Sequence, residues 1–128
     1  MESDTKIVHE TEWDLLTALW ERETATAREV AETLASSRGW AYSTVKTMLD
    51  RMVQKGLVAA RRVGNVYEYS AAVDRTDAAR SAWRRFVDTA FSGAMAPALQ
   101  FLAEDARLTK RQRRQLARLL EEGGDDDA

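Results

Sequence analysis

Hydrophobic positions in the first third of the chain recur at helical spacing. The first predicted helix runs from about Thr11 to Arg22, and the apolar stripe along it consists of Trp13, Leu16, Leu19 and Trp20. The short segment Thr24–Thr26 is typical of an edge strand. Thr26 stands three residues before Glu29, a capping-box pattern that predicts the start of a second helix. The inward positions of this helix are Ala27, Val30, Ala31 and Leu34.

A third helix is predicted from about Tyr42 to Lys55, with Gly56 as the residue that ends it. Its buried face consists of Val45, Met48, Leu49, Met52 and Val53. Two runs rich in strand-forming residues follow, Leu57–Val63 and Val66–Ser70, and Gly64-Asn65 between them predicts a hairpin turn. Three helices followed by a hairpin predict a winged helix-turn-helix.

Three further helices are predicted after Ser70. Asp74 or Asp77 caps a long helix that runs to about Phe91, and Ser92-Gly93 ends it. A short helix begins around Pro97, and a last one begins at the capping box formed by Thr109 and Gln112. The fold class is therefore mainly α with a small β-hairpin. We expect a winged-helix domain in residues 1–72, a helical region in residues 73–122 and a disordered acidic tail in residues 123–128.

Composition narrows the range of functions. The sequence has no cysteine, and its single histidine is His9, so disulfides and a structural zinc site are excluded and we expect neither metal nor other cofactor. Neither a glycine-rich phosphate loop nor a nucleophile paired with a histidine is present, which argues against an enzyme. The chain shows neither a signal-peptide pattern nor a membrane-length apolar stretch, so we expect a cytoplasmic protein that does not insert into membranes.

The net charge of −2 hides an uneven distribution. Between Arg38 and Arg62 the chain carries six cations and one anion, a local charge of +5. We predict that this region binds DNA, with the third helix in the major groove and the hairpin as a wing on the backbone. The candidate DNA-binding residues are Tyr42, Ser43, Thr44, Lys46, Thr47, Arg51, Arg61, Arg62 and Asn65. The alternatives to DNA binding are that the third helix is an ordinary amphipathic surface helix and that the charges of the hairpin serve to keep an exposed strand edge soluble.

The apolar residues of the C-terminal helices have no obvious partner inside the winged-helix unit. Packing against a second copy of the chain would bury them, which predicts a homodimer. The candidate dimerisation residues are Trp83, Phe86, Val87, Phe91, Leu99, Leu102, Leu116, Leu119 and Leu120. A satellite cluster within one chain is the alternative.

Several of these segments resemble the penicillinase and methicillin-resistance repressor family, the BlaI/MecI group. The similarity begins with Glu12-Trp13 and Leu19-Trp20. It is densest in residues 40–56, where the family reads a tryptophan, then Thr-[Val/Ile]-x-Thr-Met-Leu-x-Arg, then Lys-Gly. The wing in residues 64–69 and the segment Leu99–Asp105 also look like their counterparts in the family. The resemblance covers about Thr11 to Glu122.

The resemblance implies a dimeric repressor that binds dyad operators upstream of resistance or stress genes, such as those for β-lactamase. In this family a membrane-bound sensor metalloprotease pathway leads to cleavage of the repressor. The matching positions are Thr44, Thr47 and Arg51 for DNA, and Gln100-Phe101 for the cleaved bond. Gln100 departs from the asparagine that is usual there, and Ser43 departs from the lysine of some members. The cysteine-rich tail of the copper-responsive members is absent, so we exclude metal sensing through such a tail.

Other classes of function remain as alternatives to a DNA-binding repressor. One is a winged-helix module that binds another protein, which an exposed aromatic patch on the third helix would favour. Another is a regulator that a small ligand releases from DNA, which an apolar cavity lined by Phe86, Phe91 and Phe101 would favour.

Overall fold

The computed structural model describes residues 7–124, which form two compact units that meet within one helix. The first unit, up to Phe86, contains α2 (Glu10–Arg22), β1 (Ala25–Thr26), α3 (Ala27–Thr33) and α4 (Tyr42–Lys55). It continues with β2 (Val58–Val63), β3 (Val66–Ala71) and most of α5 (Arg75–Ala90). The second unit, from Val87, contains the end of α5, then α6 (Met95–Asp105) and α7 (Lys110–Gly124). The predicted mainly α class with a small β-hairpin is confirmed.

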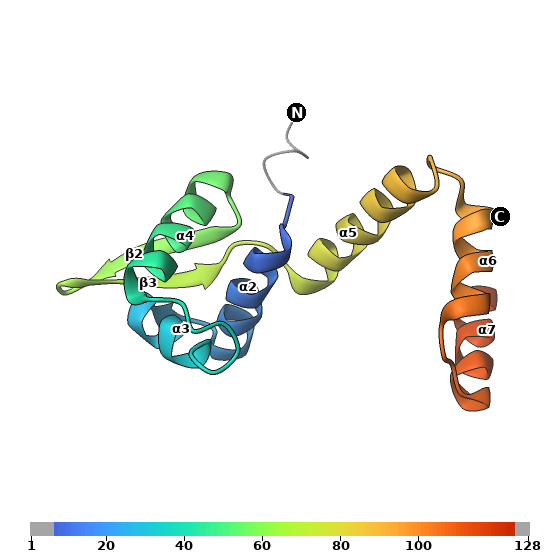
Figure 1. The fold of residues 1–128 in the computed structure, drawn as a ribbon, viewed down its shortest axis with the longest axis horizontal. Helices are drawn as coiled ribbons and strands as arrows, with labels where there is room; N and C mark the ends of the chain where they lie inside the picture. The colour runs from blue at the N-terminus through green and yellow to red at the C-terminus, as the bar shows by residue number, and fades with distance from the viewer. Residues whose placement is uncertain (1–6, 125–128) are drawn as a thin grey trace. The chain divides into compact units, whose positions relative to one another are not determined.

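The strands of the first unit form an antiparallel sheet in the order β1-β3-β2. Figure 1 shows the hairpin of β2 and β3. Val63 pairs with Val66, so Gly64 and Asn65 alone make the hairpin turn. Gly64 has a φ of 62°, a left-handed conformation that glycine adopts without a steric penalty. Ala25 pairs with Tyr69, which places the short β1 on the open edge of β3 and confirms the predicted edge strand.

One apolar core joins the helices of the first unit to this sheet. Leu15, Leu16 and Leu19 come from α2, and each is fully buried. The inward face of α4 adds apolar side chains to this core, and β3 adds Tyr69. Val45, Leu49 and Met52 are fully buried, while Met48 and Val53 pack partly buried against the same core. Because α4 buries the face that the sequence pattern assigned, its opposite face is left in solvent.

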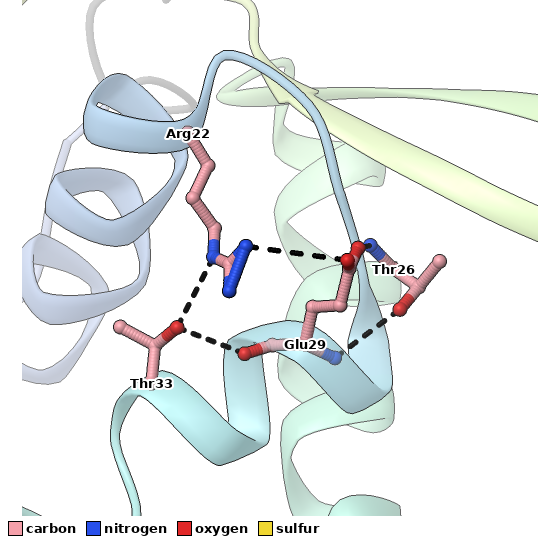
Figure 2. A network of polar contacts seen from close by, with 4 residues as sticks. All are labelled: Arg22, Thr26, Glu29 and Thr33. Atoms are coloured by element: carbon pink, nitrogen blue, oxygen red, sulfur yellow. Dashed lines mark hydrogen bonds and ion pairs between the residues drawn. The ribbon is translucent and has the colours of Figure 1, made fainter.

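Local signals in the sequence fix where α3 and α4 begin and end. The capping box of α3 is present, because Glu29 N donates to Thr26 Oγ1 at 3.2 Å and Thr26 N donates to Glu29 Oε1 at 2.9 Å. The Arg22 side chain joins this box: Nε donates to Thr33 Oγ1, and a guanidinium nitrogen lies 4.0 Å from Glu29 (Figure 2). Gly56 ends α4 with a φ of 85°, as a C-terminal glycine does.

The start of α5 belongs to the winged-helix unit, whereas the sequence pattern placed the domain boundary at residues 72 and 73. Asp74, not Asp77, caps the helix, since its carboxylate accepts from the backbone N–H groups of Thr76 and Asp77. Trp20 of α2 donates from Nε1 to the carbonyl of Val73 at 3.0 Å. This bond ties the segment before α5 to α2.

In the second unit, α6 and α7 run side by side (Figure 1) and enclose an apolar groove of about 260 Å³. The predicted capping box of α7 is confirmed, because Thr109 and Gln112 exchange hydrogen bonds. The helix continues through Gly124, so the predicted disordered tail is wrong for residues 123 and 124. The rest of that tail, residues 125–128, lies outside the described residues.

Candidate nucleic-acid interface

The polar face of α4 and the hairpin of β2 and β3 form the candidate DNA-binding surface. Thr44, Thr47 and Arg51 are exposed and lie at positions i, i+3 and i+7, so they share one side of the helix. Tyr42 and Ser43 are exposed at the start of α4. An exposed helix with hydroxyl and guanidinium groups has the shape and the donors that the major groove accepts.

Arg51 is the cation of this face that is free to meet a phosphate. Within residues 7–124 it makes neither an ion pair nor a hydrogen bond to another side chain. Lys46, which the sequence pattern also assigned to DNA, is engaged: its Nζ lies 2.8 Å from Oδ2 of Asp50. A fixed lysine and a free arginine therefore lie on the same helix, about 1.4 helical turns apart.

The hairpin carries its two arginines on consecutive positions of β2. A guanidinium nitrogen of Arg61 lies 3.3 Å from Glu68, its partner across the strands, and the Arg61 side chain remains 77% exposed. Arg62 donates from Nε to the carbonyl of Gly64 at 3.2 Å, which holds its side chain along the turn. Asn65 is exposed at the tip. All three residues lie on the hairpin that the sequence pattern assigned to the DNA backbone.

Three residues near this surface were missed by the sequence analysis. Arg28 of α3 lies 5.1 Å from the ring centroid of Tyr42, which adds a cation beside the start of α4. Asp50 and Tyr69 join α4 to β3, because the Tyr69 hydroxyl donates to Oδ1 of Asp50 at 2.8 Å. Residues 50 and 69 are far apart in the chain, and no local pattern pairs them. Arg28 shows no signal beyond its charge.

Asp50, Lys46 and Tyr69 form a hydrogen-bonded network, and the pKa of each of the three groups is shifted from its ordinary value. Partial burial raises the pKa of Asp50, but the hydrogen bonds from Lys46 and Tyr69 outweigh it and leave the pKa below its ordinary value. The hydrogen bond to Asp50 raises the pKa of Lys46 well above its ordinary value. Burial, together with the Asp50 hydrogen bond, raises the pKa of the Tyr69 hydroxyl. At neutral pH the group is therefore an ion pair bound to a neutral tyrosine.

The candidate dimerisation residues differ in how exposed their side chains are. Leu99, Leu119 and Leu120 are exposed, with Leu119 at 61%. Val87 is buried within the chain itself, so it contributes no surface that a second copy would cover. Leu102 and Leu116 line the groove between α6 and α7, and Trp83 stacks on Phe86 at 5.9 Å between centroids. Phe91 is half-buried and tilts against Phe101 at 5.8 Å.

The bond that resembles a cleavage site lies inside a helix. Gln100 and Phe101 are both exposed, and they stand in the middle of α6. The groove in this unit is lined by residues of α6, of α7 and of the connection between them, and by none of the three phenylalanines on which the effector alternative depends.

Other kinds of site have little support in the described part of the chain. Residues 7–124 contain no grouping of histidine and acidic side chains that could hold a metal ion. No helix among them combines the length and the apolar character needed to cross a bilayer.

These features define the class: a winged-helix domain that exposes a polar helix beside a basic hairpin, followed by a helical region. A family model described as penicillinase repressor matches residues 8–122. The chain therefore belongs to the penicillinase repressor family and is a transcriptional repressor by class.

Individual relatives agree with this assignment. The penicillinase repressor of Bacillus licheniformis is 23% identical over 115 residues, which cover 90% of each chain. The methicillin resistance regulatory protein MecI of Mammaliicoccus sciuri is 22% identical over 93 residues, or 73% of this chain and 76% of that protein. The crystal structure of YusO from Bacillus subtilis aligns with a TM-score of 0.51 at 21% identity. That alignment covers 97% of this chain and 80% of YusO, and it shows a shared fold alone.

Proposed function

We propose that this repressor acts as a homodimer on a dyad operator in double-stranded DNA, with α4 of each copy in the major groove. The observation that carries the proposal is the exposed face formed by Thr44, Thr47 and Arg51 beside the arginines of the hairpin. Family membership supports it, since the relatives are named as repressors of penicillinase and regulators of methicillin resistance. β-Lactamase genes or related resistance and stress genes are the targets that this kinship favours.

Each part of the surface has its own role in this proposal. Thr44 and Thr47 contact base edges, while Arg51 contacts a phosphate or the edge of the groove. Tyr42 and Ser43 approach the backbone at the start of α4. Arg61, Arg62 and Asn65 form the wing, which tracks the backbone and the adjacent minor groove. These assignments follow from exposure and position, and the free guanidinium of Arg51 supports the phosphate role most directly.

The second unit joins the two copies. Exposed leucines on α6 and α7 flank the apolar groove between these helices, and a second copy would remove them from water. The leucines proposed for this contact are Leu99, Leu102, Leu116, Leu119 and Leu120. A dimer with one α4 per half-site requires half-sites about one helical turn apart, or a multiple of it.

Cleavage at Gln100-Phe101, through a membrane-bound sensor metalloprotease pathway, is the proposed route of derepression. A cut there separates α7 from the winged helix and weakens the dimer, so each half-site loses the effective concentration that the partner copy supplies. Because the bond lies within α6, the helix must unwind locally before a protease can reach it. Mass spectrometry of the protein from induced cells should find the two fragments. A chain that stays intact while the target gene is expressed would favour release by a small ligand.

A threonine substitution tests base reading by α4. Thr47→Ala should weaken binding to a selected operator by about 1–3 kcal/mol and leave binding to random DNA nearly unchanged. Thr89→Ala is the matched control, since Thr89 is an exposed threonine of α5 outside the proposed surface. Fluorescence anisotropy with both duplexes measures the difference. Equal weakening on both would move Thr47 to the backbone, and no weakening on either would remove it from the surface.

A further inference from the structure

Lys46, Asp50 and Tyr69 form a bonded group at the junction of α4 and β3. Lys46 Nζ donates to both carboxylate oxygens of Asp50, at 3.0 Å to Oδ1 and 2.8 Å to Oδ2. The Tyr69 hydroxyl donates to Oδ1 at 2.8 Å. One carboxylate therefore binds a side chain of its own helix and a side chain of the wing strand.

Aromatic rings complete the surroundings of the lysine. The ammonium nitrogen lies 5.7 Å from the ring centroid of Tyr67 and 5.7 Å from that of Tyr69. Both rings project from β3 two residues apart, so they share one face of the strand. A carboxylate and two ring faces hold the ammonium, and each of these contacts is lost if Lys46 extends toward a phosphate.

Neither member of the ion pair is needed for the hydrophobic core, and an exposed pair at i, i+4 adds little stability. Tyr69 differs, because it is 1% exposed and a buried hydroxyl needs an acceptor. Asp50 supplies that acceptor from α4. The group therefore attaches the wing strand to the helix, and it neutralises the lysine that stands nearest the junction.

We propose that Asp50 is a positioning residue of the DNA-binding surface, which withholds the Lys46 ammonium from phosphates and holds the wing strand β3 against α4. The sequence pattern assigned Lys46 to the DNA backbone, and this proposal gives it a different role. The wild-type surface then binds phosphates through Arg51 and the wing, and Asp50 lowers its affinity for DNA of any sequence. This inference rests on the proposed function, because it concerns how that surface meets DNA.

Releasing the lysine should strengthen non-specific binding. Asp50→Asn removes the charge of the side chain and keeps an oxygen that can accept from Tyr69. One additional phosphate contact steepens the slope of log affinity against log salt by about 0.9, which corresponds to about eightfold tighter binding near 0.1 M salt. The probe is a short, labelled duplex of random sequence, titrated by fluorescence anisotropy between about 50 and 200 mM salt.

The lysine variants separate this mechanism from simple charge repulsion. Lys46→Met alone should leave the wild-type slope unchanged, because the lysine does not touch phosphate. In the Lys46→Met background, Asp50→Asn should no longer steepen the slope. An equal gain from Asp50→Asn with and without Lys46 would show that the carboxylate merely repels DNA, and would overturn the proposal.

Another variant, Tyr69→Phe, removes the hydroxyl that β3 donates to Asp50, and its result does not depend on whether the Asp50 variants fold. Tyr69→Phe keeps the Lys46–Asp50 pair, so the salt slope should stay at the wild-type value. A slope that falls by about one unit in Lys46→Met alone would place the lysine on a phosphate and overturn the proposal. If the wild-type protein fails to bind duplex DNA at low salt, the proposed function fails, and this inference fails with it.

Discussion

A nearly buried ion pair connects the start of α2 to the end of α4, and its removal should destabilise the winged-helix unit. Lys55 Nζ donates to Oε1 of Glu12 at 2.7 Å, and the backbone N–H of His9 donates to the same oxygen at 2.9 Å. Glu12 is 8% exposed. Lys55→Met leaves this carboxylate with the His9 N–H as its remaining partner among the described residues.

The expected loss of stability depends on how far Glu12 and Lys55 are exposed to water. Breaking a buried pair costs about 3–5 kcal/mol, because one charge stays buried without its partner. The Lys55 side chain is 25% exposed, so water partly replaces the ammonium, and we expect a loss of about 2–3 kcal/mol in the free energy of unfolding. Glu12→Gln should cost about half as much, because the lysine left behind reaches solvent.

Urea denaturation followed by tryptophan fluorescence measures the loss. The midpoint should fall while the slope of unfolding free energy against urea stays constant, the signature of a change in stability alone. Lys110→Met is the control, since Lys110 is exposed at the start of α7, and it should shift stability by less than about 0.5 kcal/mol. In the Glu12→Gln background, Lys55→Met should cost little more. A Lys55→Met protein as stable as the control variant would refute the reasoning.

Further predictions concern a helix cap, a buried hydroxyl and the dimer. Thr26→Ala should cost about 1 kcal/mol, and urea titration measures it. The backbone N–H of Thr26, which this substitution keeps, holds the pKa of Glu29 below its ordinary 4.5. The stability that comes from this pKa shift is present above pH 4.5 and is lost as pH falls through the folded-state pKa. Burial raises the pKa of Tyr69, so stability should be lost as pH rises beyond its ordinary 10.0; thermal melts of Tyr69→Phe should show a smaller loss, and an identical one would contradict this. Replacing Leu119 and Leu120 by serine should convert a dimer to monomers in sedimentation experiments, whereas a wild-type protein that is monomeric at micromolar concentration, with or without operator, would refute dimerisation.

Local signals in the sequence predicted most of the fold. The stripe of α4 identified the core side chains of that helix, whereas the stripe of α2 included Leu16 and Leu19 but missed the fully buried Leu15. Gly56 and Gly64 take the left-handed conformations that a helix end and a tight turn require. Two candidate caps for α5 remained open, because both aspartates precede the same apolar pattern. The hydrogen bonds to Asp74 decide between them, and they depend on the path of the connection.

Contacts between distant residues account for what the sequence could not predict. Periodicity places Lys46 on the polar face of α4, but it cannot show that Asp50 and the rings of β3 hold the ammonium. The pair between Glu12 and Lys55 spans 43 positions and has no local pattern. The bond from Trp20 to Val73 spans 53 positions, and no local pattern predicts it either.

The sequence of the DNA that this repressor selects tests the central claim most directly. The purified protein is mixed with fragments of genomic DNA, and the retained fragments are sequenced alongside the input. The account predicts a shared dyad motif whose half-sites lie about one helical turn apart, or a multiple of it, and whose enrichment falls in a variant that carries both Thr44→Ala and Thr47→Ala. Retained fragments with the same sequence content as the input, or enrichment that stays at the wild-type level in this double variant, would contradict operator recognition by the exposed face of α4.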